Sequence, residues 1–184
     1  DPNYETAYHD RGVAKEKLND FYGAIEDFNK AIELDPQNSV FYCNRGAAKG
    51  KLNDFHGAIV DYNKSIQLDI YNAEAYYGRG ISKEKLIDYR GALSDYNKAI
   101  EFDNMKGKFY NNRGAVKYKL KDYKGSLSDF NSAIKLDPNN AMAFCNRGLA
   151  KIKLNDKNGG CLDLSKAGEL GFQVAYESIK KYCN

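Results

Sequence analysis

The sequence is poor in the residues that disordered chains, metal sites and membrane spans require. Its 184 residues include three prolines and no tryptophan, whereas 42% are apolar, a balance that favours a folded chain over a disordered or collagen-like one. No stretch approaches the roughly 18 consecutive apolar residues of a transmembrane helix. The four cysteines form no Cys-x-x-Cys pair, so neither a zinc site nor a dithiol motif is indicated. We therefore expect a folded protein with no membrane span, no metal and no cofactor.

Neither sign of charge is in large excess. The sequence has 28 basic and 25 acidic residues, which gives a formal net charge of +3. So small an excess does not predict nucleic-acid binding, which usually requires a strongly basic surface. Only six of the basic residues are arginines. The placement of these arginines is therefore informative.

Internal repetition is the strongest signal in the sequence. The dipeptide Arg-Gly recurs every 34 residues, and the same offset aligns the segment GAIEDFNKAIELDP, which begins at residue 23, with four later segments. A fixed period of this length indicates stacked helical hairpins. The repeats are predicted to run over residues 5–38, 39–72, 73–106, 107–140 and 141–174.

The unit resembles the tetratricopeptide repeat, a 34-residue helix–turn–helix with two aromatic positions, a glycine and a small residue at fixed places. The first aromatic column is Tyr8, Tyr42, Tyr76, Tyr110 and Phe144, and the glycine column is Gly12, Gly46, Gly80, Gly114 and Gly148. The small column is Ala24, Ala58, Ala92, Ser126 and Gly160, and the second aromatic column is Phe28, Tyr62, Tyr96, Phe130 and Leu164. The resemblance implies an all-α, right-handed α-solenoid. It also implies a non-catalytic protein–protein interaction scaffold that holds a peptide or partner-protein segment in a concave groove.

The two ends depart from the repeat. Residues 1–4 match the tail of a repeat, so we expect a preceding repeat and a longer array, which leaves localisation open. The fifth repeat is degenerate, because Lys157 replaces an aromatic residue found in the other four. Residues 175–184 place apolar side chains on one helical stripe. We expect them to form a capping helix that covers the last apolar face of the array.

The array also departs from the family pattern at two packing positions, which have become cationic. One is a lysine column, Lys15, Lys49, Lys83, Lys117 and Lys151; the other is an arginine column, Arg11, Arg45, Arg79, Arg113 and Arg147. The second helix of each repeat carries an aspartate, in the column Asp27, Asp61, Asp95, Asp129 and Asp163. Arginine offers a planar fork that suits a carboxylate. We predict an arginine–aspartate ladder of partly buried pairs, with arginines that line a ligand groove as the alternative.

Two cysteines fall near the C-terminus. Cys161 occupies a column of aliphatic residues, which favours a buried thiol. If the last repeat helix and the capping helix run antiparallel, Cys161 and Cys183 could instead face each other in a disulfide. Cys43 and Cys145 are three repeats apart and are expected to line the groove.

The first helices should supply the ligand-binding face, because family members line their groove with these helices. Family members that bind extended peptides use asparagines in the column of Asn44, Asn112 and Asn146, and an amide can bond both backbone groups of a peptide. His9, Tyr77 and Asn111 belong to the neighbouring column. A lysine row at the groove edge favours an acidic ligand or a C-terminal carboxylate, unless these residues are only a solvated row. The row is Lys17, Lys51, Lys85, Lys119 and Lys153.

Other functions have less support in the sequence. An enzyme needs a nucleophile, a base or a metal set converging in one pocket, and the two histidines, His9 and His56, lie in different predicted repeats. We therefore expect no catalytic activity. The first alternative to peptide binding is a self-assembling structural segment that associates through its uncapped first repeat, or a targeting module of a larger protein. RNA binding is a weaker alternative.

Overall fold

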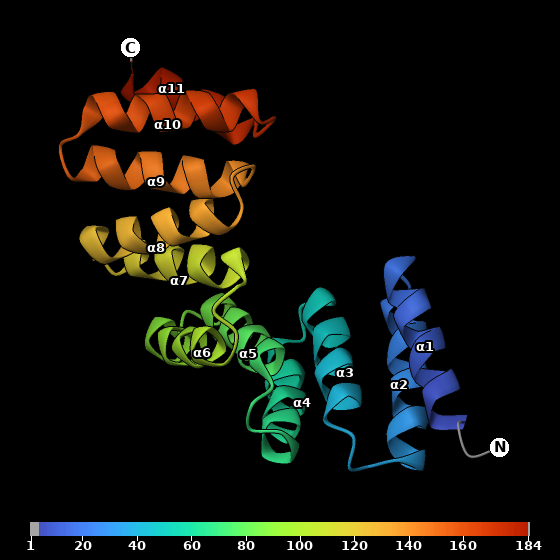
Figure 1. The fold of residues 1–184 in the computed structure, drawn as a ribbon. Helices are drawn as coiled ribbons and strands as arrows, with labels where there is room; N and C mark the ends of the chain where they lie inside the picture. Colours follow the sequence, from blue (N-terminus) through green and yellow to red (C-terminus); the bar gives the residue numbers. More distant parts are fainter. Residues whose placement is uncertain (1–3, 184) are drawn as a thin grey trace. The chain divides into compact units, whose positions relative to one another are not determined.

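The computed structural model describes residues 4–183, and every regular element in this part of the chain is an α-helix (Figure 1). The predicted all-α class is therefore confirmed. The expected tail of a preceding repeat lies outside the described residues, except for Tyr4, which begins the first helix. The helices are α1 (Tyr4–Lys17), α2 (Phe21–Leu34), α3 (Ser39–Lys51), α4 (Phe55–Leu68), α5 (Ala73–Lys85), α6 (Tyr89–Phe102), α7 (Gly107–Lys119), α8 (Tyr123–Leu136), α9 (Ala141–Lys153), α10 (Lys157–Glu169) and α11 (Val174–Tyr182).

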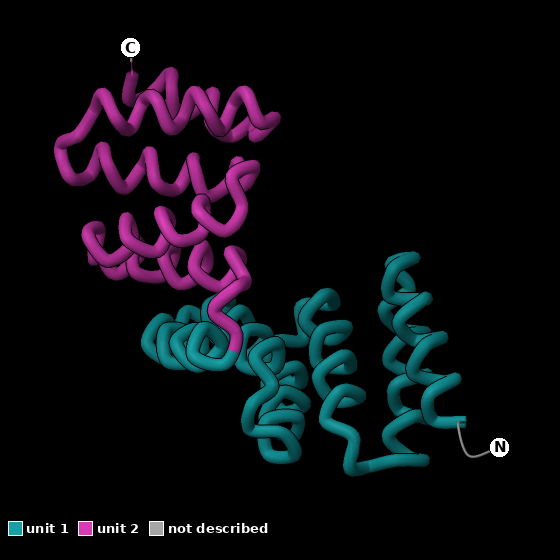
Figure 2. Tube along the Cα trace, in the orientation of Figure 1, with its two compact units in different colours: residues 1–102 teal, residues 103–184 magenta. Residues whose placement is uncertain are grey.

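The chain divides into two compact units, residues 1–102 and 103–184 (Figure 2). In both units the helices pack as antiparallel pairs, α1 with α2, α3 with α4 and α5 with α6 in unit 1, and α7 with α8 and α9 with α10 in unit 2. The second helix of a pair also packs against the first helix of the next pair, as in α2–α3, α4–α5 and α8–α9. The first helices are themselves neighbours, α1 with α3 and α3 with α5 in unit 1, and α7 with α9 in unit 2.

Short turns set the start of each second helix. An aspartate precedes the helix and its side chain accepts a hydrogen bond from the backbone N–H three residues later, at 2.9 Å in all five cases. This contact satisfies one of the unpaired N–H groups of the first turn and places a negative charge at the positive end of the helix dipole. The residue before each aspartate has a positive φ; these residues are Asn19, Asn53, Ile87, Lys121 and Asn155.

The core of each pair forms where the two helices cross. A Cβ atom added to Gly12 would lie 2.7 Å from the Phe28 ring, so the close approach of α2 to α1 requires glycine there. Phe28 is fully buried between Ala24 and Ala48. The corresponding aromatic or leucine residues of the later pairs are at most 5% exposed. The small and aromatic columns therefore form the helix-packing core.

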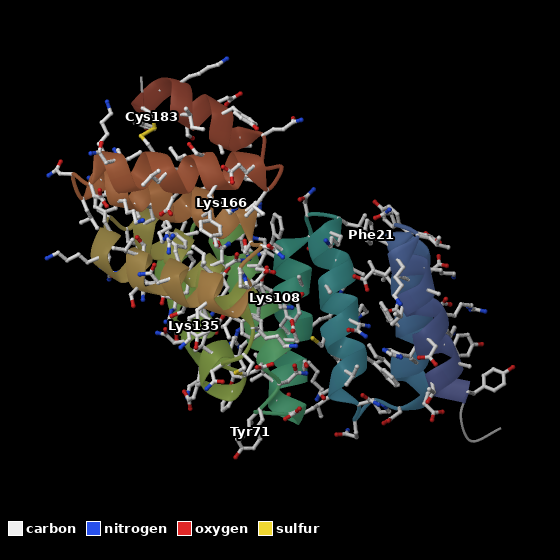
Figure 3. The ribbon with its side chains drawn as sticks, turned by 45° about the horizontal axis from the view of Figure 1, so that its top comes forward. Phe21, Tyr71, Lys108, Lys135, Lys166 and Cys183 are labelled. Carbon is white, nitrogen blue, oxygen red and sulfur yellow. A yellow bond between two sulfur atoms is a disulfide. The ribbon has the colours of Figure 1, made fainter. Side chains whose placement is uncertain are left out.

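The last helix, α11, packs against α10 and also contacts α9. Its Ala175 is fully buried and belongs to an apolar cluster with Cys145, Leu164 and Ala167. Cys183, directly after α11, forms a disulfide with Cys161 of α10 (Figure 3). The favoured interpretation of Cys161 as a free buried thiol is therefore wrong, because α11 folds back along α10 and brings the two cysteines together.

Candidate functional site

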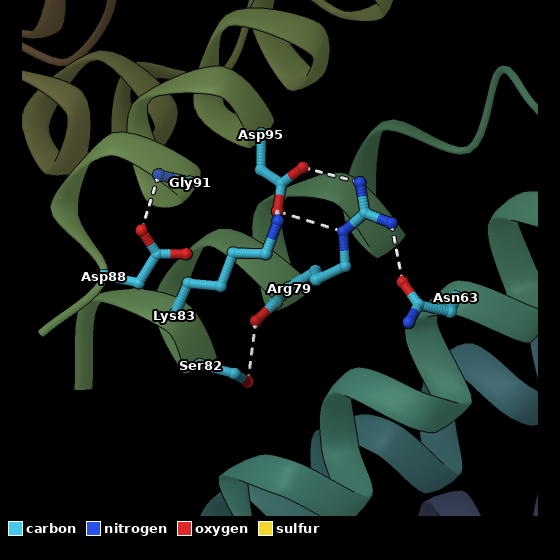
Figure 4. A network of polar contacts seen from close by, with 8 residues as sticks. Asn63, Arg79, Ser82, Lys83, Asp88, Gly91 and Asp95 are labelled. Carbon is cyan, nitrogen blue, oxygen red and sulfur yellow. Dashed lines mark hydrogen bonds and ion pairs between the residues drawn. The ribbon is translucent and has the colours of Figure 1, made fainter. Parts of the chain in front are cut away.

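The arginine column is engaged within the helix pairs. Each arginine of the first helix donates two hydrogen bonds to the aspartate 16 residues later on the second helix, one from Nε at 2.8–2.9 Å and one from Nη2 at 2.6–2.7 Å. Figure 4 shows this arrangement for Arg79 and Asp95. The aspartate side chains are only 2–8% exposed. Each carboxylate is therefore buried, but its charge is paired in bidentate geometry.

A lysine contacts the same carboxylate. It lies four residues after the arginine, one helical turn along the same face. Its Nζ is 2.7–2.9 Å from the aspartate Oδ2, the oxygen that also accepts the hydrogen bond from the arginine Nε. This contact was not among the predictions from sequence, although the spacing of four residues between the two cationic columns was a signal for it. In the first pair, the hydrogen bond from Arg11 is the main cause that lowers the pKa of Asp27, and Lys15 adds to it. One buried anion thus holds two cations.

The guanidinium groups also stack on aromatic rings. Each lies 5.2–5.6 Å from the centre of the ring three residues earlier in the same helix. This distance is within the range of a cation–π interaction. The first aromatic column therefore orients the arginine as well as filling the core.

The arginines also connect neighbouring helix pairs. The Nη1 atoms of Arg45, Arg79 and Arg147 donate hydrogen bonds of 2.7–2.9 Å to asparagines on the second helix of the preceding pair. The acceptors are Asn29, Asn63 and Asn131. No sequence-based prediction included this asparagine column. These contacts give the arginines a packing role, so the alternative of a ligand-binding arginine groove has no support from the described contacts.

A different stripe of the first helices carries the predicted ligand-binding residues. In unit 1 the side-chain amide of Asn44 on α3 lies 2.8 Å from Nε2 of His9 on α1, and Nδ1 of His9 lies 3.1 Å from Asp10. In unit 2 the amide of Asn146 on α9 donates a 3.2 Å hydrogen bond to Asn111 on α7. The contacts of Asn44 and Asn146 each join two adjacent first helices. The structure thus brings Asn44 together with His9, and Asn146 together with Asn111.

The remaining members of this stripe are held by packing. Asn111 is 5% exposed, and its amide lies 3.4 Å from the side-chain oxygen of Asn112. The Tyr77 ring lies 5.8 Å from the Tyr96 ring, and burial raises the pKa of Tyr77 to about 12. Each unit therefore has its own first-helix face, which we define as the polar stripe of its first helices: His9, Asn44 and Tyr77 in unit 1, and Asn111, Asn112 and Asn146 in unit 2.

The lysine row lies at one end of the first helices. Each of its five residues is the last residue of a first helix and is exposed. A cation at a helix C-terminus is stabilised by the helix dipole, which is one reason for lysine at this place. In unit 1, Lys17 and Lys51 line a hollow of about 440 Å³ together with Val13, Glu16, Asn19 and Phe21. Burial raises the pKa of Glu16, and the charge of Lys51 opposes this shift.

The sequence was also compared with models of protein families. A model described as tetratricopeptide repeat matches residues 6–38 and 107–140, and a second model with the same description matches residues 28–60. The chain is a tetratricopeptide repeat protein. A search of curated protein sequences found no match.

Solved tetratricopeptide repeat structures share the fold. PilF of Pseudomonas aeruginosa has a TM-score of 0.85 at 17% identity, over 93% of this chain and 78% of PilF. YrrB, described as a TPR protein with an unusual peptide-binding site, has a TM-score of 0.75 at 21% identity, over 94% of this chain and 90% of YrrB. The first TPR domain of Spaghetti (RPAP3), bound to the HSP90 peptide SRMEEVD, has a TM-score of 0.64 at 25% identity, over 66% of this chain and 96% of that domain.

Among residues 4–183, no group of three or more His, Cys, Asp or Glu side chains is arranged to hold a metal ion. No helix in the same range is long and apolar enough to cross a membrane. Tetratricopeptide repeat proteins generally act as non-catalytic interaction scaffolds, and the repeats and structural neighbours of this chain support that role.

Proposed function

We propose that this scaffold binds an extended segment of a partner protein on the first-helix face of one of its units. The proposal rests on one observation: the residues that pack the helix pairs and the asparagines lie on different stripes of the first helices. Arginine, lysine, glycine and aromatic residues on one stripe make the contacts that hold the helix pairs together. The asparagines lie on another stripe, at the junctions between neighbouring first helices.

The contacts of these asparagines support binding rather than oppose it. A side-chain amide can donate two hydrogen bonds and accept two, so a single contact leaves hydrogen-bonding capacity for a ligand. The contact with a neighbouring helix also fixes the orientation of the amide, which reduces the entropy lost on binding. Asn44 and Asn146 are half-buried, as expected for groups that remain accessible. We therefore assign them, with Asn112, to the binding of peptide backbone groups.

The lysine row supports a preference for acidic segments or for a free C-terminal carboxylate. The five ammonium groups lie at equivalent helix ends, and two of them line the hollow in unit 1. The RPAP3 domain, which is 25% identical over its matched part, binds a peptide that ends in acidic residues. An acidic segment on the first-helix face would place its charges near the lysine row.

A peptide library displayed on phage tests this function. The chain is used to select ligands, and binding of a selected peptide is measured by calorimetry for the wild type and for the triple variant Asn44→Ala, Asn112→Ala, Asn146→Ala. We expect a loss of at least about tenfold in affinity, because the variant removes the asparagine contacts to the peptide backbone from the first-helix face of either unit. Asn158→Ala, which changes an exposed asparagine on a second helix, is the matched control. Equal binding by the triple variant and the control would contradict the assignment.

The acidic preference has its own measurement. Lys17→Ala combined with Lys51→Ala should weaken binding of an acidic peptide and reduce its dependence on salt. Lys124→Ala combined with Lys135→Ala removes two exposed lysines of a second helix and serves as the control. Amidation of the peptide C-terminus separates a requirement for a terminal carboxylate from a requirement for acidic side chains. An unchanged salt dependence in the first variant would contradict the preference.

Self-association through α1 is a second candidate function. The Arg11 side chain is 59% exposed, whereas the four later arginines are 18–19% exposed. Arg11 also lines a hollow of about 300 Å³ with Tyr4, Ala7 and Tyr8. Light scattering over a range of concentrations tests this candidate. A mass that rises with concentration in the wild type but not in Ala7→Glu would support it, and a constant monomer mass would contradict it.

A further inference from the structure

The C-terminal helix α11 is fastened at both ends. At one end it follows a turn in which Gly171 has a φ of +89°, a backbone conformation that other residues rarely adopt. At the other end Cys183 is bonded to Cys161, in the second turn of α10 (Figure 3). The helix therefore follows a glycine-containing turn at its N-terminal end and is covalently bonded to α10 at its C-terminal end.

Few other contacts hold α11: Ile179 packs against the apolar cluster, and the Tyr176 hydroxyl donates a 3.3 Å hydrogen bond to the Gly168 carbonyl. The helix has nine residues, and only Ala175 among them is fully buried, whereas Val174 and Tyr176 are more than half exposed. A helix shorter than about 12 residues is marginal in water without packing partners. We therefore expect α11 to be the least stable helix of unit 2 once the disulfide is removed.

This helix covers an apolar face of the pair α9–α10. The cluster beneath it contains Cys145, Leu164 and Ala167. By packing on α10 and contacting α9, α11 repeats the way in which α9 packs on α8 and contacts α7. It therefore takes the place of a next first helix. Counting 34 residues on from Gly148 gives Tyr182, so α11 lacks the glycine at which a second helix would cross.

We propose that the Cys161–Cys183 disulfide is a redox-modification site at which a dithiol reductant opens α11 and uncovers the apolar face of α9 and α10. A thiolate of the dithiol attacks one sulfur of the bond, which forms a mixed disulfide and releases the other protein cysteine as a thiolate. The second thiol of the dithiol then attacks the mixed disulfide and displaces the remaining protein cysteine. The protein gains two electrons and two protons and ends with two thiols, while the dithiol becomes a disulfide. Both cysteines are partly exposed, which allows the reagent to approach.

Cys145 is a built-in reporter of this opening. It is a free cysteine with 2% exposure in the cluster that contains Ala175. Burial raises the pKa of its thiol, which further slows its reaction with alkylating reagents. Cys43, the other cysteine outside the disulfide, lies in α3 of unit 1 and serves as an internal standard.

Hydrogen exchange read by mass spectrometry tests the proposal on the whole chain, with and without dithiothreitol. We expect residues 174–183 to exchange at least about tenfold faster in the reduced protein, as the loss of a loop-closing bond implies, and α2 to remain unchanged. In the variant Cys161→Ser, Cys183→Ser, residues 174–183 should exchange rapidly without reductant. Its Cys145 should also be alkylated faster than Cys145 of the oxidised wild type, when both rates are divided by the rate at Cys43.

Two results would overturn the proposal. One is that residues 174–183 exchange as slowly as before after the mass of the protein shows that the disulfide is reduced. The other is free thiols at both positions in the air-oxidised protein. Should the double variant lose its helical circular dichroism, the exchange of the reduced wild type alone decides between the outcomes.

Discussion

At the scale of single residues, the buried aspartates are the most sensitive positions of the helix pairs. Asp95 is 2% exposed and is contacted by both Arg79 and Lys83 (Figure 4). Replacing it with alanine leaves two cations without their anion in a partly buried place. We expect Asp95→Ala to lower the free energy of unfolding by about 3 kcal/mol. Urea denaturation measures the loss, and Lys98→Ala is the control.

The control removes an exposed ion pair between neighbouring turns of α6, Lys98 with Glu101. Such pairs contribute little, so its effect should stay below about 0.5 kcal/mol. Losses of equal size in the two variants would show that the buried carboxylate is not a special position.

The first pair predicts a dependence on pH. Because the pKa of Asp27 is lowered in the folded state, the pair with Arg11 stabilises the fold above the ordinary pKa of 3.8, and this stabilisation is lost as the pH falls through the lower folded value. The difference in stability between the wild type and Asp27→Asn should therefore be constant from pH 7 to about 5 and shrink below about 4. Urea titrations across this range measure it. A difference that grows in acid would contradict the ion pair.

Ile87 is a strained residue. It is β-branched and 72% exposed, yet it has a φ of +66°, where three of the other four turns have asparagine. Ile87→Asn should raise the free energy of unfolding by about 1 kcal/mol, because asparagine tolerates this conformation and no buried contact is lost. The reverse change, Asn53→Ile, should lower it by a similar amount. Thermal unfolding measures both, and a destabilised Ile87→Asn would mean that the isoleucine makes an unrecognised contact.

At the scale of helices, the caps define where each second helix begins. Asp122 accepts a hydrogen bond from the backbone of Gly125 at 2.9 Å. Asp122→Ala should cost about 1 kcal/mol, whereas Asp122→Asn keeps an acceptor and should cost much less. Chemical denaturation distinguishes the two. Equal losses would indicate that the charge, rather than the hydrogen bond, stabilises the helix start.

The caps are local features, because each aspartate lies three residues before the N–H group that it accepts from. The glycine column recurs at a fixed place in every repeat, so its position could be predicted from the period alone. The sequence also predicted pairing between the arginine and aspartate columns, and in the structure each arginine of the column contacts an aspartate. The second contact from the lysine and the acceptor role of Asn29 were not foreseen, because both depend on how the two helices of a pair and the adjacent pairs are rotated.

At the scale of the whole molecule, contacts between repeats were harder to derive. His9 and Asn44 are 35 residues apart and meet only because α1 and α3 lie side by side. Their columns predicted that both residues lie on the ligand-binding face, but the repeat pattern gave no reason to expect a contact between them. The Cys161–Cys183 bond was misjudged for a similar reason, since it depends on the direction in which α11 runs. The period of the sequence predicts the features inside each repeat well, whereas the contacts between repeats depend on how the helices pack in three dimensions.

The binding role of the first helices is most directly tested by hydrogen exchange of the chain in complex with a phage-selected peptide. In the unit that binds the peptide, we expect the amides of the first helices to become protected, around Asn44 in unit 1 or around Asn112 and Asn146 in unit 2, while α2, α4 and α8 keep their exchange rates. Protection confined to the second helices, with the first helices unchanged, would contradict the proposed binding face.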